Sequence, residues 1–216
     1  MTDLSCLLSG LIRLLTAPVL LIILHKKTGA RLYPAVIALL ACLPAFIIAG
    51  VIRSGFSHDN FYAYYIRQGL LYGIFEEGAK FLVLRFYLTS YDSRRDAVSY
   101  GIGHSAFEDI GAGLSCFGLI GTDRAAPDIL LHNIWAEAEG VLLVAALTVL
   151  IFYGIQTGKS KVMLPAAILL HAFGNMIAGL FIDSAAIIAR TLLTAGICFA
   201  AYRCYRALWT PFEDEA

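Results

Sequence analysis

Long apolar stretches separated by short polar segments run along the whole chain. A helix needs about 20 apolar residues to cross the roughly 30 Å of hydrocarbon in a bilayer, and seven stretches of about that length can be marked. They cover residues 4–24, 33–52, 61–88, 97–121, 129–153, 162–181 and 185–205. The pattern predicts an all-α fold: a polytopic transmembrane helical bundle of about seven spans, forming a single domain over residues 1–216.

Composition supports a membrane protein and argues against one class of partner. Hydrophobic residues make up 59% of the 216 residues and charged residues 15%, and the mean hydropathy is +0.76. Sixteen basic and sixteen acidic residues give zero net charge, so the sequence indicates no nucleic-acid partner. The five cysteines show no paired metal spacing and are interpreted as buried thiols. The expected environment is the lipid bilayer, specifically the bacterial cytoplasmic membrane.

Basic residues predict the orientation of the bundle. Connecting segments rich in Lys and Arg alternate with segments that are poor in them. The rich segments and the C-terminal end hold Lys26, Lys27, Arg31, Arg94, Arg95, Lys159, Lys161, Arg203 and Arg206. The poor segments hold only Arg53 and Arg124. Because cytoplasmic segments carry the excess of basic residues, the N-terminus is predicted outside and the C-terminus inside, which requires an odd number of spans.

One predicted span contains an unexpected group of charges, in the stretch "IFEEGAKFLVLR" at residues 74–85. An ionisable side chain at the centre of a bilayer costs about 3 kcal/mol on insertion scales, so Glu76, Glu77 and Lys80 need partners or water. Lys80 lies four residues after Glu76 and three after Glu77, so it can pair with either along one helix face. A purely structural interpretation is a buried ion pair that holds helices together.

Two further spans carry polar stripes of the same kind. "GIGHSAFEDI" places His104 and Glu108 four residues apart, and "LLHAFGNMIAG" does the same with His171 and Asn175. At about 1.5 Å per residue, all three stripes reach a similar depth. Imidazole nitrogens and carboxylate oxygens are zinc ligands, and a free carboxylate nearby can act as a general base. We therefore expect a metal or acid–base site, supplied with water by a cavity that opens most simply at the cytoplasmic face with its basic rim.

The order of these motifs resembles that of a known superfamily. "EEGAK", "HSAFE" and "HAFGN", in that order on three predicted membrane helices, are similar to the three-motif signature of the intramembrane glutamate/metallo-proteases, which include CAAX-processing and bacteriocin-processing proteases and PrsW-type peptidases. "FEEGAK" followed by "YGIGHSAFEDI" most resembles the YhfC-type membrane peptidases. The resemblance covers residues 69–180 and implies a catalytic core formed by spans 61–121 and 162–181.

The resemblance implies roles for individual side chains. Glu76 would activate the attacking water, Glu77 paired with Lys80 or Arg85 would orient the site, and Asn175 would donate to the developing oxyanion. The implied catalytic residues are therefore Glu76, Glu77, Lys80 and Asn175, and the implied metal ligands are His104, Glu108 and His171. His104 could instead hold a neighbouring carboxylate, and His171 could act as a base. Zinc is the expected ion, and a metal-free glutamate mechanism stays open.

The chain also departs from the family patterns. CAAX-type enzymes have an Arg four residues after the second Glu, where this chain has Phe81, and Lys80 matches the PrsW-type members instead. YhfC-type sequences tend to carry a Glu and then a His in the fifth span. Here Glu137 and Glu139 occur without the His, and since they are two apart they point in different directions, so one of them could face the pocket.

The predicted function is that of an intramembrane endopeptidase, a hydrolase acting on a membrane-associated protein or peptide substrate. Prenylated proteins, anti-sigma factors, signal peptides and bacteriocin precursors are all compatible with the resemblance. Two alternatives belong to other classes. One is a non-catalytic membrane scaffold of the same superfamily, and the other is a proton- or ion-coupled transporter, which the lack of an evident inverted repeat disfavours.

Overall fold

The computed structural model describes residues 2–58, 60–122, 128–180 and 184–208, and within these ranges the fold is entirely helical. Within the described ranges seven α-helices follow one another, and a short π-helical turn, η1, continues the third. Their bounds are α1 (Thr2–Thr28), α2 (Tyr33–Ser54), α3 (Phe61–Leu82), η1 (Val83–Tyr87), α4 (Arg94–Phe117), α5 (Ile129–Gln156), α6 (Ser160–Leu180) and α7 (Ser184–Ala207). Each helix covers one predicted apolar stretch, which confirms the all-α prediction.

The helices are those of an integral membrane protein. Five of them, namely α1, α2, α5, α6 and α7, are long and apolar enough to cross a bilayer. Large apolar side chains point outward from them, such as Leu40 on α2 at 61% exposure and Leu192 on α7 at 69%. The remaining helices, α3 and α4, have 22 and 24 residues and carry the polar side chains of the site, which lowers their hydropathy.

Local sequence signals fix several helix ends. The side chain of Asn60 caps α3 by accepting a hydrogen bond from the Ala63 amide at 3.0 Å. Ser93 caps α4 in the same way with the Arg95 amide. Gly29 ends α1 with a positive φ of 69°, a conformation that a residue with a Cβ adopts only with strain.

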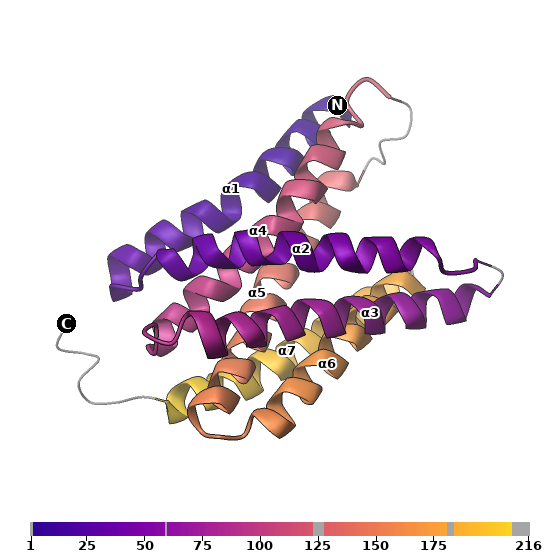
Figure 1. Cartoon of the computed structure of the whole chain (residues 1–216). Helices are drawn as coiled ribbons and strands as arrows, with labels where there is room; N and C mark the ends of the chain where they lie inside the picture. The colour runs from indigo at the N-terminus through magenta and orange to yellow at the C-terminus, as the bar shows by residue number, and fades with distance from the viewer. Residues whose placement is uncertain (1, 59, 123–127, 181–183, 209–216) are drawn as a thin grey trace.

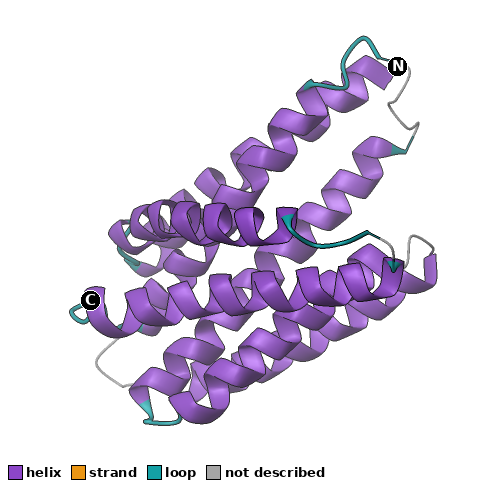
Figure 2. Cartoon of the chain, turned by 45° about the vertical axis from the view of Figure 1, so that its right-hand side comes forward, coloured by secondary structure: helices purple, strands orange, loops and turns teal. Residues whose placement is uncertain are grey.

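The helices form two groups that diverge from a common region (Figure 1). In one group, α1 lies against the C-terminal part of α4 and the N-terminal part of α5; in the other, α3 lies against α6 beside α7. Figure 2 shows the same divergence after rotation by 45°. The groups meet toward the end of the bundle where α1, α3, α5 and α7 terminate, and they separate toward the opposite end.

Close helix contacts in the common region depend on glycine. A Cβ added to Gly73 of α3 would lie 2.7 Å from the carbonyl oxygen of Ile168 in α6, and one added to Gly103 of α4 would lie 2.3 Å from that of Ala35 in α2. Backbones can approach this closely only where the side chain is absent. These contacts draw α2, α3, α4 and α6 together around the polar stripes.

Candidate active site

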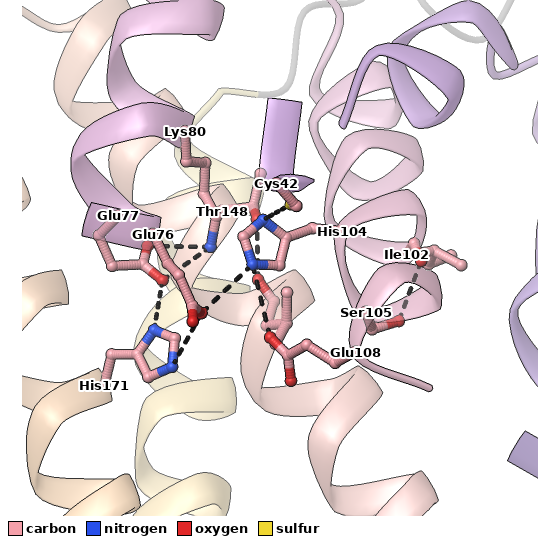
Figure 3. Close-up of polar contacts among 11 residues, drawn as sticks. Cys42, Glu76, Glu77, Lys80, Ile102, His104, Ser105, Glu108, Thr148 and His171 are labelled. Carbon is pink, nitrogen blue, oxygen red and sulfur yellow. Dashed lines mark hydrogen bonds and ion pairs between the residues drawn. The ribbon is translucent and has the colours of Figure 1, made fainter. Parts of the chain in front are cut away.

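The three polar stripes meet in the common region of the bundle (Figure 3). Nε2 of His104 on α4 and Nε2 of His171 on α6 each lie 3.5 Å from Oε2 of Glu76 on α3. His104 Nε2 is also 3.5 Å from Oε1 of Glu108. Two imidazole nitrogens and two carboxylates therefore face one another, although they come from three helices that are far apart in sequence.

Lys80 and Glu77 form a fully buried support for one of these imidazoles. Lys80 Nζ lies 2.8 and 2.9 Å from the two carboxylate oxygens of Glu77, and both side chains are 0% exposed. Glu77 Oε1 lies 2.7 Å from Nδ1 of His171. Of the two pairings that the spacing allowed, Lys80 thus adopts the one with Glu77. Because Nδ1 is engaged, Nε2 of His171 is the nitrogen that faces Glu76.

Cys42 supports the second imidazole, and sequence reasoning missed it. Its Sγ lies 2.9 Å from Nδ1 of His104, and both residues are buried. This contact leaves Nε2 of His104 directed toward Glu76 and Glu108. A single cysteine in an apolar stretch has the same sequence pattern as an ordinary core thiol, so only the packing of α2 on α4 reveals the contact.

The donor set fits a metal ion. Glu76 Oε2 is buried and has no hydrogen-bond partner in the part of the chain that the structure describes. Ligand atoms of Glu76, His104 and Glu108 all lie within 4.8 Å of one another. Donors held about 2.1 Å from zinc in a tetrahedron are about 3.4 Å apart, close to the 3.5 Å separations that join Glu76 to both imidazoles. Glu76, which was predicted to act as the base, is therefore also one of the possible metal ligands. His171 is not one of these three residues, but its Nε2 lies next to Glu76 Oε2.

The contact between Cys42 and His104 gives a testable prediction for metal binding. Loss of a group that orients a histidine ligand typically weakens metal affinity 10- to 100-fold. We expect Cys42→Ala to weaken metal binding by about that factor, and Cys42→Ser, which keeps a hydrogen-bonding atom, to restore most of it. Competition against a chelator in detergent measures both. Equal affinity of Cys42→Ala and the unmodified chain would show that the thiol does not position His104.

A cavity of about 370 Å³ gives access to the site. Its lining consists of Phe46, Tyr65, Gln68, Tyr72, Glu76, Glu108, His171, Asn175, Ala178 and Gly179. Glu108 is the most open of the charged groups, with 42% of its side chain exposed. Asn175, predicted as an oxyanion donor, lies one helical turn beyond His171 and faces the same cavity.

The cavity runs in the opposite direction to the one expected from the sequence. On α3 it is lined by residues that precede Glu76, and on α6 by residues that follow His171. It therefore opens where α2 ends and α3 begins, away from the segments rich in Lys and Arg. The expectation was wrong because the buried Lys80 and the apolar core beyond it fill the other end.

Neither glutamate of the fifth helix lines this cavity. Glu137 lies 3.2 Å from Arg13 of α1, whose guanidinium also contacts Asp109 at 3.1 Å. Glu139 lies 3.3 Å from Arg190 of α7. Each carboxylate has thus paired with a basic residue of a different helix, as buried charges require, and the expectation that one could face the pocket was wrong.

Comparison with protein families identifies a match. The family model described as YhfC intramembrane metalloprotease matches residues 9–117 of the chain. The matched segment includes the motifs with Glu76 and His104 and ends before the motif with His171. No curated protein and no solved structure matches the chain.

Proposed function

Because the chain belongs to the YhfC intramembrane metalloprotease family, we propose that it is an intramembrane endopeptidase that hydrolyses a peptide bond within or beside the bilayer. One observation carries the proposal: two imidazole Nε2 atoms face the unpartnered Oε2 of Glu76 at the floor of a cavity. Peptide hydrolysis needs a general base, a polarising group and access for water, and this arrangement supports all three.

We assign metal binding to His104, Glu108 and His171, with zinc as the proposed ion, and we keep Glu76, which also lies at ligand spacing from both imidazoles, for the attacking water. The Nδ1 contacts of the two imidazoles support this assignment, because they leave both Nε2 atoms free to coordinate. When bound, zinc would supply Lewis-acid polarisation of the substrate carbonyl and of the attacking water. The mixture of nitrogen and oxygen donors suits zinc.

Glu76 is the proposed general base. Its carboxylate takes a proton from the water as the water oxygen adds to the substrate carbonyl carbon. As the carbon–nitrogen bond breaks, Glu76 passes that proton to the leaving amine, so the residue ends the cycle ionised as it began. At 8% exposure the carboxylate is reached only through the cavity that it lines, and its position between the imidazoles keeps it near the reacting atoms.

Asn175 and the pair of Glu77 and Lys80 complete the proposed machinery. Asn175 lines the cavity one turn beyond His171. Its side-chain amide group can donate to the oxyanion that forms when water adds to the substrate carbonyl. Glu77 holds the ring of His171 through Nδ1, and Lys80 balances the charge of Glu77. Glu77 and Lys80 therefore act as positioning residues, since the groups that meet the substrate are His171 and its neighbours in the cavity.

A survey of newly formed N-termini tests the proposal without knowledge of the substrate. Membrane proteins are labelled at their free N-termini in cells that make the chain and in cells that make Glu76→Gln. We expect new termini within or beside transmembrane segments only with the unmodified chain. Identical termini in both samples would contradict proteolysis and favour the scaffold alternative.

A further inference from the structure

The direction of the cavity carries information about the substrate. Along α3 the lining residues Tyr72, Gln68 and Tyr65 follow one helix face away from Glu76. Tyr65 is eleven residues from Glu76, which corresponds to about 16 Å at 1.5 Å per residue. Asn175 and Ala178 extend along α6 in the same direction. The polar site is thus reached from the end of the bundle where the two groups of helices diverge.

The opposite end of the site is closed by packed apolar side chains. Lys80 is 0% exposed. Beyond it Leu84, Leu88, Tyr100 and Leu147 belong to one core cluster and are at most 6% exposed. Water or peptide could enter from that side only by separating these side chains.

The closed end carries most of the basic residues outside the apolar stretches. Arg31 Nε donates to Asp96 Oδ2 at 2.9 Å, and Arg94 Nη1 donates to the Tyr205 carbonyl at 3.4 Å. The α1–α2 connection, the start of α4 and the end of α7 therefore lie together. Together with the last turn of α1, which carries Lys26 and Lys27, they hold seven of the nine basic residues assigned above to rich segments. Lys159 lies between α5 and α6, and Lys161 lies in the first turn of α6.

These two observations together define which side of the membrane the site faces. The positive-inside rule places the closed, basic end in the cytoplasm. We propose that the site receives its substrate from the extracytoplasmic side, and that the substrate is the outer juxtamembrane segment of an exported or membrane-anchored protein. This inference rests on the proposed peptidase function and excludes prenylated C-termini, which are cytoplasmic, as substrates.

The chemistry of the cavity wall suits an extended peptide. Hydroxyl and amide groups of Tyr65, Gln68 and Asn175 can pair with backbone groups of a peptide that has left its own helix. Phe46, whose ring stacks on that of Tyr72 with the centroids 5.9 Å apart, adds an apolar surface to the cavity wall. Unpaired peptide groups in a bilayer need such partners.

Thiol labelling in intact cells tests the inference. Gln68→Cys and Ala178→Cys introduce cysteines into the cavity from α3 and α6, and Lys159→Cys places one at the closed end. Cys198 and Cys204, which are only partly buried, are replaced by Ser in each variant. The probe is a charged, membrane-impermeant methanethiosulfonate added to sealed cells. We expect both cavity positions to react before permeabilisation and Lys159→Cys to react only after it.

Other outcomes overturn the inference without affecting the proposed function. Reaction of the cavity positions only from the cytoplasmic side would reverse the assigned orientation, while proteolysis by the unmodified chain would remain. Protection of both positions from both sides would show that this cavity is not the route for water. A further readout concerns the substrate: compared with the same variant before labelling, Ala178→Cys labelled from outside should no longer form the new N-termini. Unchanged termini would show that the substrate does not use the cavity.

Discussion

Replacement of Glu76 by Gln is expected to lower the rate of peptide hydrolysis by a factor of about 10² to 10⁴, the usual contribution of a general base. Gln has nearly the same shape as Glu and keeps the contacts with neighbouring groups, but it cannot accept the proton of the attacking water. The two imidazoles at 3.5 Å from Glu76 Oε2 remain in place around it. The rate is measured as formation of new N-termini over time in membranes containing equal amounts of protein.

A matched control is available on another helix. Glu139→Gln makes the same chemical change in a buried glutamate that pairs with Arg190 and lies outside the cavity. We expect this variant to retain the rate per folded molecule. A normal rate in Glu76→Gln, or an equal loss in Glu139→Gln, would contradict the role assigned to Glu76.

Replacement of Lys80 by Met is expected to destabilise the protein by about 3–5 kcal/mol, because it leaves Glu77 buried without its counter-charge. Both side chains are 0% exposed and lie 2.8 Å apart. Glu77 would keep its contact with His171 Nδ1 at 2.7 Å. Its negative charge, no longer balanced by Lys80, would then act on the active site. Unfolding in detergent with increasing denaturant measures the loss.

Two further variants test whether the stability lost in Lys80→Met comes from the unpaired Glu77 and not simply from removing a basic side chain. Arg85→Met removes a basic side chain from η1, where it is exposed, and should change stability by no more than about 0.5 kcal/mol. The double variant Lys80→Met/Glu77→Gln removes both charges and should recover much of the stability lost in Lys80→Met. If the double variant is as unstable as Lys80→Met, the buried pair is not the cause.

The helices and the meeting of the polar stripes were accessible from the sequence for simple reasons. Apolar length predicts where a span lies, so the stretch 33–52 became α2 (Tyr33–Ser54) with the same start. The spacing of four residues in two stripes predicts a shared helix face. His104 and Glu108, four residues apart on α4, accordingly lie 3.5 Å from each other across one turn.

The remaining features depend on which helices pack together, and local pattern does not specify that. Cys42 contacts His104 because α2 crosses α4 at Gly103. Arg13 and Arg190 each needed a buried partner, but their pairing with Glu137 and Glu139 follows from the contacts of α5 with α1 and α7. The direction of the cavity follows from the way α2, α3, α4 and α6 pack around it, which no spacing in the sequence encodes.

The central claim is that the side chains around Glu76 form a metal-dependent hydrolytic site, and the metal content of the purified protein in detergent tests it most directly. The chain is compared with Glu108→Ala and His171→Ala after each has been shown to fold. The account predicts close to one zinc ion per molecule in the unmodified chain and a loss of zinc in both variants. A chain that hydrolyses peptide bonds without bound metal, or variants that keep the full zinc content, would contradict it.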